Sequence, residues 1–336
     1  MTYTDYLNKL IAGTDLSADE TTDVMDQLMD GELTPAQVAA FITALRIKGE
    51  TTDEISAAAL SMRRHATRID AGAPPVVDTC GTGGDGSGTF NISTTAAFIA
   101  AGAGAKIAKH GNKSVSSQCG SADVLAALGV NLDITPEQVG NCVRDVGIGF
   151  LFAPKLHGAM KHAIGPRREL GVRTIFNMLG PLTNPAGATA QVIGVFDAAL
   201  TGVFAEVLNK MGSSRAMIVH GSDHLDEITL TGTTQVSELK DGKVETRQLD
   251  PLEYVGSLCS AEALKGGDAE VNAGILRDIL GGAEGPKADV AKLNAAAAIY
   301  VGGLADDLGA AYGKAGDAIE SGAAKQKLDD LVAAAS

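Results

Sequence analysis

The glycine-rich segment at residues 80–94, CGTGGDGSGTFNIST, constrains the fold more than any other part of the sequence. It follows a short β-prone run at 76–78 and precedes an apolar, helix-like run at 92–103. Five glycines within eight residues allow backbone N–H groups to approach an anion closely. Asn91, Ser93 and Thr94 offer capping side chains near the helix start, where the helix dipole favours negative charge. The segment therefore predicts a strand–loop–helix unit that binds an anion.

Two common phosphate-binding loops do not fit this segment. The stretch from Gly81 to Gly86 satisfies G-x-G-x-x-G, but a dinucleotide site also needs an acidic residue about 20 positions later. No Asp or Glu occurs between Asp85 and Asp123, and no G-K-[ST] follows the glycines. Residues 86–122 instead contain three lysines and no acidic residue, in a chain of net charge −14. We infer a phosphate or diphosphate ligand, with a glycine-rich turn lacking any ligand as the alternative.

A second donor-rich loop follows the next β-prone run, at 106–108. It contains Lys109, His110, Asn112 and Lys113, and then serines at 114, 116 and 117. Loops after successive strands of one α/β sheet meet at the carboxyl edge of that sheet, where such folds bind ligands. Another acid-free basic stretch, from 146 to 168, ends in Arg167 and Arg168, and arginine suits bidentate carboxylate recognition. For each of these cations a solvated surface position is the alternative.

An acidic pair, Asp226 and Glu227, follows a β-prone run at 216–219 within the segment HGSDHLDE. Carboxylates after a strand are ligands that suit Mg²⁺, which also binds phosphates. Zinc held by His220 and His224 is an alternative, although their spacing matches no standard zinc site. A plain acidic surface loop is the other alternative. A second acidic pair at 306–307 lies in an Ala-rich helical stretch, and we interpret it as helix surface.

The overall pattern predicts an α/β protein preceded by a small all-helical domain. Residues 1–70 contain only helix signals, including capping boxes at Ser17 and Thr51 and a Thr34-Pro35 helix start. After a break at 71–75, β-prone runs alternate with helical runs, which is typical of a largely parallel sheet. The runs are 76–78, 106–108, 148–151, 191–195 and 216–219 for strands and 92–103, 136–146 and 198–211 for helices. A hairpin is predicted at 233–249, and an Ala-rich helical region from 261 onward.

Composition narrows the range of compartments and partners. The four cysteines show no C-x-x-C or zinc spacing, so we expect reduced thiols in a cytoplasmic protein. The N-terminus has no signal-peptide pattern, and no apolar run reaches the ~20 residues of a membrane span. The sequence pI is near 4.8, which argues against nucleic acid or an anionic membrane as the main partner.

Four long runs resemble the anthranilate phosphoribosyltransferase family. They are GTGGDGSGTFNIST at 81–94, KHGNKSVSSQCGSADVLAALG at 109–129, RRELGVRTIFNMLGPLTNP at 167–185 and HGSDHLDEIT at 220–229. The resemblance implies transfer of the 5-phosphoribosyl group from phosphoribosyl diphosphate to the amine of anthranilate, with release of diphosphate, in tryptophan biosynthesis. It implies a helical domain at 1–72 with an excursion near 165–185, and an α/β phosphoribosyl-diphosphate-binding domain at 73–336. It also implies a homodimer built through the helical domain.

The same resemblance implies roles for individual residues. Phosphoribosyl diphosphate is expected at Gly81, Gly84, Asp85, Thr89, Asn91, Ser93, Thr94, Lys109, His110, Gly111, Asn112 and Ser121. Anthranilate is expected at Gly81, Asn112 and Arg167, with His110 and His157 lining its entry. Ser93, Asp226 and Glu227 are expected to hold Mg²⁺, and we expect two ions per monomer. The sequence indicates no general base.

Two other functions are compatible with the same scaffold. A pyrimidine nucleoside phosphorylase needs a nucleobase pocket and inorganic phosphate, and the runs around Arg167 and Asp226-Glu227 argue against it. A non-catalytic nucleic-acid-binding relative should have a basic surface and a degraded acidic pair. This chain has a net charge of −14 and both carboxylates, so we favour the transferase.

Overall fold

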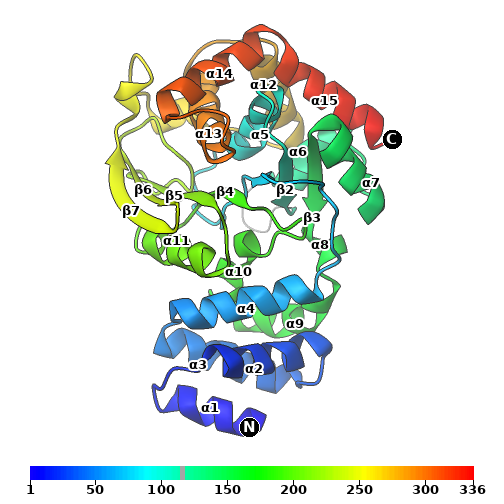
Figure 1. Cartoon of the computed structure of the whole chain (residues 1–336), viewed down its shortest axis with the longest axis vertical. Coiled ribbons are helices and arrows are strands. Elements are labelled where there is room, and N and C mark those ends of the chain that lie inside the picture. Colours follow the sequence, from blue (N-terminus) through cyan, green and yellow to red (C-terminus); the bar gives the residue numbers. More distant parts are fainter. Residues whose placement is uncertain (114–117) are drawn as a thin grey trace.

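A computed structural model describes residues 1–113 and 118–336 of the chain. Its lower part is a helical bundle made of two segments that lie far apart in the sequence (Figure 1). The bundle helices are α1 (Tyr3–Ile11), α2 (Ala18–Asp30), α3 (Pro35–Lys48), α4 (Thr52–His65) and α9 (Lys161–Leu170). The predicted helix starts are confirmed, because Ser17, Thr34 and Thr51 each accept a hydrogen bond from the backbone N–H three residues later. The α9 helix packs against α2 and α3.

The upper part is built on a seven-stranded sheet with the order β3-β2-β1-β4-β5-β6-β7. The strands are β1 (Val77–Asp78), β2 (Ile107–Gly111), β3 (Ile148–Phe152), β4 (Ala190–Gly194), β5 (Arg215–Gly221), β6 (Thr234–Lys240) and β7 (Lys243–Leu249). The first five are parallel, and β6 and β7 form the predicted antiparallel hairpin. Val77 of β1 lies opposite both Ile107 and Ala190. The strand order reverses between β1 and β4, and such a switch point is where open α/β sheets bind ligands.

Helices cover both faces of this sheet. One face carries α5 (Ile92–Gly102), α12 (Ala269–Leu280), α13 (Pro286–Val301), α14 (Leu308–Glu320) and α15 (Ala323–Ala334), and α10 (Phe176–Leu182) and α11 (Leu200–Lys210) lie between the sheet and α4 (Figure 1). Shorter helices are α6 (Ser121–Ala127), α7 (Pro136–Asn141), which continues as a π-helix over Cys142–Val146, and α8 (Ala153–Leu156). Short 3-10 turns lie at Gly158–Met160, Pro251–Glu253 and Ala261–Leu264.

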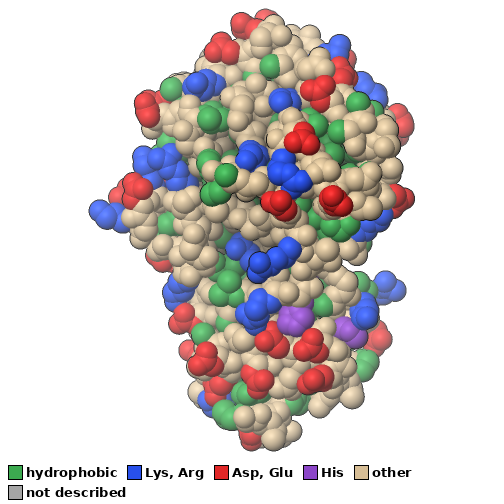
Figure 2. Space-filling view, turned by 45° about the vertical axis from the view of Figure 1, so that its right-hand side comes forward, with side chains coloured by type: hydrophobic (Ala, Val, Ile, Leu, Met, Phe, Trp, Pro, Cys, Tyr) green, Lys and Arg blue, Asp and Glu red, His purple; other side chains and the backbone are tan. Residues whose placement is uncertain are grey.

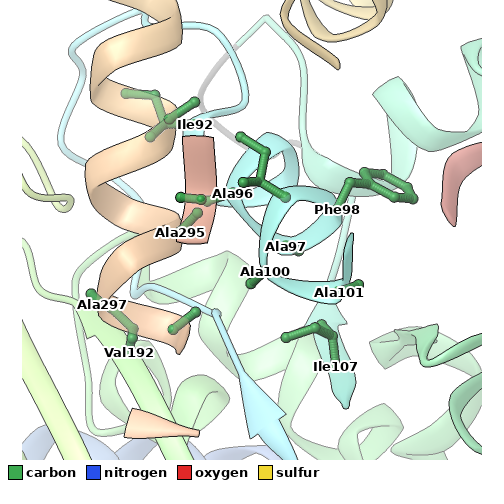
Figure 3. Packing of buried hydrophobic residues seen from close by; sticks show 14 of the residues in the cluster. Ile92, Ala96, Ala97, Phe98, Ala100, Ala101, Ile107, Val192, Ala295 and Ala297 are labelled. Carbon is green, nitrogen blue, oxygen red and sulfur yellow. The ribbon is translucent and has the colours of Figure 1, made fainter. Parts of the chain in front are cut away.

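Small side chains let α5 and α13 pack closely. Ala96 of α5 faces Ala295 of α13, and Ala297 lies on the other side of α13 next to Val192 of β4 (Figure 3). On another side of α5, the α15 helix approaches so closely that it leaves no room for a side chain. A β-carbon at Gly102 would lie 2.6 Å from the backbone nitrogen of Ala324, so α15 can pack there only against glycine. This tight packing fixes α5, whose N-terminus follows the glycine-rich loop.

The apolar core of the bundle continues into the α/β domain. One cluster of buried side chains includes Phe41 of α3, Leu179 of α10, Phe204 of α11 and Ile218 of β5. Three chain crossings join the two parts, after α4, after β3 and after α10. Backbone bonds link these crossings, from Thr67 N–H to the Leu156 carbonyl (2.8 Å) and from Ile69 N–H to the Pro185 carbonyl (3.1 Å). Within the described residues, no helix has the length and apolar character needed to cross a membrane.

Candidate active site

The glycine-rich loop after β1, the end of β4 and the loop between β5 and β6 are packed together at the switch point. The Thr82 N–H donates to the Gly194 carbonyl (2.8 Å), which joins the first two. A β-carbon at Gly194 would lie 1.4 Å from the Asp226 carbonyl oxygen, and one at Gly81 would lie 2.9 Å from Asp226 Oδ2. Gly194 therefore requires glycine, and a side chain at Gly81 would displace the Asp226 carboxylate. The predicted anion loop and the predicted acidic pair thus form one site.

Asp226 and Glu227 face backbone donors of the loop–helix unit. Asp226 Oδ2 accepts from the Gly83 N–H (2.8 Å), and Glu227 Oε1 accepts from the Ser93 N–H (3.1 Å). Desolvation and then the charge of Asp85 raise the pKa of Asp226, and desolvation and then the charge of Asp226 raise the pKa of Glu227. The charge of Lys109 opposes the second shift. Clustered, desolvated carboxylates of this kind fit a divalent cation with oxygen preference, such as Mg²⁺.

The loop itself holds conformations that favour glycine. Gly83, Gly84, Gly86 and Gly88 all have φ between 67° and 78°. Asp85 lies between them and interacts with Asp226. A small cavity beside the loop is lined by residues that include Gly81, Ser93, Gly194 and Glu227. The structure thus brings Gly81, Gly84, Asp85 and Ser93 together with the acidic pair.

The prediction that a side chain caps α5 is wrong. The helix has no side-chain cap bond at Asn91, and Asn91 instead donates to the Cys119 carbonyl (3.3 Å) and accepts from Asn272 Nδ2 (3.0 Å). The Asn91 amide therefore connects the glycine-rich loop to the segment before α6. The Thr94 hydroxyl is buried and has no hydrogen-bond partner among the described residues. Thr89 lies further along the loop, in an isolated bridge with Lys265.

The second donor-rich loop reaches the same edge of the sheet. Buried Lys109 donates through Nζ to the Thr79 carbonyl (2.5 Å), directly after β1. A β-carbon at Gly111 would lie 2.3 Å from Ser121 Oγ, and that hydroxyl donates to the Asn112 carbonyl (3.3 Å). Gly111, Asn112 and Ser121 are therefore in contact, and Lys109 precedes them on β2. The serines at 114, 116 and 117 lie outside the described residues.

Two neutral histidines form a buried pair beside this loop. His110 Nε2 lies 3.2 Å from His157 Nε2, and His110 Nδ1 lies 3.2 Å from the Gly180 carbonyl. Burial lowers the pKa of His110 to about 3 and that of His157 to about 4. Because a carbonyl only accepts, we assign the proton of His110 to Nδ1, and its Nε2 then accepts from His157. The two rings form an uncharged wall of the site.

Among the described residues, Asp78, Cys80 and His110 form a group of three His, Cys, Asp or Glu residues whose ligand atoms all lie within 4.8 Å of one another. Their polar groups, however, are already engaged. Asp78 accepts from the His110 N–H (3.0 Å) and from Asn184 Nδ2 (2.7 Å), and burial raises the pKa of the Cys80 thiol. Thiolate is the form that binds metal, so this cluster is a hydrogen-bonded core. The four cysteines are thiols rather than disulfides, as predicted.

Arg167 and Arg168 differ sharply in surroundings. Arg167 is half-buried in α9, with Cζ 5.2 Å from the ring centroid of Phe176, and burial lowers its pKa. Arg168 is exposed. Two other cations of the basic stretches lie away from the site, because Lys106 donates to the Ala73 carbonyl before β1 and Lys155 pairs with Asp133. Lys and Arg side chains gather at the waist of the molecule, between two parts that both carry acidic side chains (Figure 2).

In the sequence, Arg173 follows the acid-free basic stretch shortly after Glu169 without an assigned role, and it lies in the turn between α9 and α10. Its Nη2 donates to the Gly84 carbonyl (3.0 Å), and its Cζ lies 4.0 Å from the ring centroid of Phe196. Nothing in the local sequence separates it from the other arginines of the chain, since the contact depends on the packing of the two domains.

The fold and this site define a two-domain glycosyl transferase. Residues 4–66 match the family described as "Glycosyl transferase family, helical bundle domain", and residues 73–325 match "Glycosyl transferase family, a/b domain". The anthranilate phosphoribosyltransferase of Desulfatibacillum aliphaticivorans is 54% identical over 330 residues, with 98% of each chain covered.

Solved structures agree with this class. The Thermus thermophilus anthranilate phosphoribosyltransferase has a TM-score of 0.94 and 43% identity, with 98% of this chain and 99% of that chain covered. The Saccharomyces cerevisiae enzyme, solved in complex with PRPP and Mg, has a TM-score of 0.89 and 29% identity, with 99% and 97% covered. The chain belongs to the anthranilate phosphoribosyltransferase family. Its activity is the transfer of the 5-phosphoribosyl group to anthranilate in tryptophan biosynthesis, and the two alternative functions are set aside.

Proposed function

We propose that phosphoribosyl diphosphate binds at the switch point with its diphosphate on the glycine-rich loop. The observation that carries this placement is the contact of Asp226 and Glu227 with the N–H groups of Gly83 and Ser93. Gly84 and Asp85 belong to the same loop, and Thr89, Asn91 and Thr94 continue it toward the ribosyl phosphate. Lys109, His110, Gly111, Asn112 and Ser121 complete the proposed site from the second loop.

Ser93, Asp226 and Glu227 are proposed to hold magnesium, two ions per monomer. Mg²⁺ supplies neutralisation of the negative charge that builds on the leaving diphosphate. The chain's own groups contribute in the same direction, because Lys109 and the backbone N–H groups of the loop are donors aimed at this edge of the sheet. Asp226 and Glu227 hold the loop in position, because they accept hydrogen bonds from the Gly83 and Ser93 N–H groups.

Anthranilate is proposed to bind between the two domains, with its amine aligned toward C1 of the ribose. Alignment of the two reactants supplies much of the rate acceleration in such a transfer. Gly81, Asn112 and Arg167 would contact the substrate, and the neutral rings of His110 and His157 would line its entry. Uncharged aromatic rings suit the entry of an aromatic substrate, whose amine is barely protonated at neutral pH. Arg167 supplies the positive charge for the carboxylate.

We also propose a homodimer built through the helical domain and a cytoplasmic location. Two large apolar side chains of the helical domain are exposed, Ile11 at the end of α1 (70%) and Ile47 near the end of α3 (82%). A second copy of the chain would cover these side chains. The proposed domains are 1–72 with the excursion near 165–185, and 73–336, which follow the two segments of the bundle.

The test is a steady-state assay with anthranilate, phosphoribosyl diphosphate and Mg²⁺. The Asp226→Asn/Glu227→Gln double variant keeps side-chain size and removes two charges, so activity should fall at least 100-fold and its magnesium dependence should weaken. Asp306→Asn, a substitution at an exposed acid far along the chain, is the matched control and should leave both unchanged. Activity and magnesium dependence that survive in the double variant would contradict the metal assignment.

A further inference from the structure

Arg173 joins the two domains at the glycine-rich loop. It lies between α9 and α10, in the segment that completes the helical bundle, yet its guanidinium donates to the Gly84 carbonyl of the other domain at 3.0 Å. A β-carbon at Gly84 would lie 3.6 Å from the same Nη2 atom. The guanidinium is therefore in direct contact with the loop proposed to receive the diphosphate.

The orientation of this guanidinium is fixed from two sides. Its Cζ lies 4.0 Å from the ring centroid of Phe196, which is close enough for a cation–π contact. Phe196 is itself tied to the loop, because its N–H donates to Thr82 Oγ1 at 3.1 Å. The Phe196 ring covers one face of the guanidinium and the Gly84 carbonyl occupies one edge. The other edges are free to contact a ligand.

Most of the donors of Arg173 are uncommitted. An arginine has five N–H donors, and the hydrogen bonds of the described residues use one Nη2 donor. No described carboxylate lies within ion-pair distance of it, although Asp85 follows Gly84 directly in the sequence. Arg173 is exposed, so it is a solvated cation held at the loop without an acidic partner, in a chain with 41 acidic residues.

We propose that Arg173 is a further diphosphate-binding residue, which donates to the leaving diphosphate of phosphoribosyl diphosphate while it holds the Gly84 carbonyl. This inference rests on the proposed placement of the diphosphate on the glycine-rich loop. A planar guanidinium presents paired donors that match phosphate oxygens. The negative charge on the diphosphate increases as its bond to C1 of the ribose breaks, so a positive charge fixed at the loop stabilises the departing group more than the bound substrate.

A guanidinium also recognises carboxylates, so anthranilate is the competing ligand. The geometry favours the diphosphate because Arg173 contacts the glycine-rich loop itself. Binding measurements separate the two, since magnesium diphosphate carries only the leaving group, ribose 5-phosphate carries only the sugar phosphate, and anthranilate carries only the carboxylate.

The experiment compares Arg173→Ala, Arg173→Gln and Arg173→Lys with wild type, and uses Arg168→Ala as the matched control. Arg168 is an exposed arginine of the same segment, and no described hydrogen bond joins it to the loop. Calorimetry should show magnesium diphosphate binding about 10- to 100-fold weaker in Arg173→Ala, with ribose 5-phosphate and anthranilate affinities changed less than about twofold. The KM for phosphoribosyl diphosphate should rise and kcat should fall. Arg168→Ala should match wild type.

The Gln and Lys variants distinguish charge recognition from loop support. Gln keeps a donor for the Gly84 carbonyl but carries no charge, so it should behave like Ala. Lys keeps the charge and should recover part of the diphosphate affinity, with a dependence on salt that Gln lacks. Full recovery in Gln would show a purely structural role, and a loss that falls on anthranilate would reassign the ligand; either result overturns the proposal. If wild type itself binds no magnesium diphosphate, the proposed function fails, which is a different outcome.

Discussion

Replacement of Arg167 by alanine tests how the carboxylate of anthranilate is recognised. Arg167 and Arg168 are adjacent on α9, so their side chains point about 100° apart and only one of them can face the site. Arg167 is the half-buried one, held against Phe176, and Arg168 is exposed. Arg167→Ala should therefore weaken anthranilate binding, and Arg168→Ala should have little effect.

The size of the effect follows from the kind of contact that is lost. A hydrogen bond to a charged group contributes roughly 1.5–3 kcal/mol. Since about 1.4 kcal/mol corresponds to a factor of ten, the KM for anthranilate should rise about 10- to 150-fold. The stacking contact with Phe176 adds about 0.5–1 kcal/mol to stability, so the variant should unfold at a slightly lower temperature and still be folded at 25 °C.

The assay follows the disappearance of anthranilate fluorescence at varied concentrations of each substrate. The KM for phosphoribosyl diphosphate should change much less than that for anthranilate, because Arg167 lies on α9 and no described hydrogen bond joins it to the glycine-rich loop. Opposite behaviour of the two variants would show that the register on α9 is shifted by one residue. If neither variant alters the KM for anthranilate, the carboxylate is held elsewhere.

Three further predictions concern the loop, the histidine pair and the assembly. Gly83→Val places a β-branched residue at φ +67°, a backbone conformation that costs about 1–2 kcal/mol. Because no atom lies within 4 Å of the new β-carbon, weaker phosphoribosyl diphosphate binding in calorimetry would arise from the changed backbone. Unchanged affinity would refute the assignment of the diphosphate to this loop. The pKa of His157 is about 4 in the folded state and about 6.5 in the unfolded state, so the unfolded state takes up the proton first and the free energy of unfolding falls as the pH drops below about 6.5. Between pH 7 and pH 5, the free energy of unfolding of His157→Gln, measured in urea, should fall by roughly 1–2 kcal/mol less than that of wild type. An equal fall in both proteins would contradict the burial of His157. Light scattering at micromolar concentration should give the mass of a dimer, and a monomer would count against an interface on the helical domain.

The strand–helix alternation and the meeting of two loops at one sheet edge could be predicted from sequence, because short buried strands leave clear apolar runs and parallel strands share an edge. The acidic pair could be predicted for the same reason, since it follows β5 in the chain. Lys106 and Lys109 look equivalent in the sequence, yet Lys106 precedes the first residue of β2 and points to the opposite end of the sheet. The roles of Asn91 and Arg173 depend on partners 28 to 181 residues away, and no local pattern carries such information.

The shared apolar core of the bundle has a consequence for synthesis on the ribosome. Helices α2–α4 bury their apolar faces against α9, α10 and α11 as well as against one another. Roughly 145 residues separate His65 from Lys210, and at about 5–20 residues per second their synthesis takes roughly 7 to 30 s. During that interval the nascent N-terminal helices are too short to be stable alone and expose the side chains that their later partners will cover. The first 65 residues to emerge are therefore among those that finish folding late, and a nascent-chain holdase has its longest opportunity to act on them.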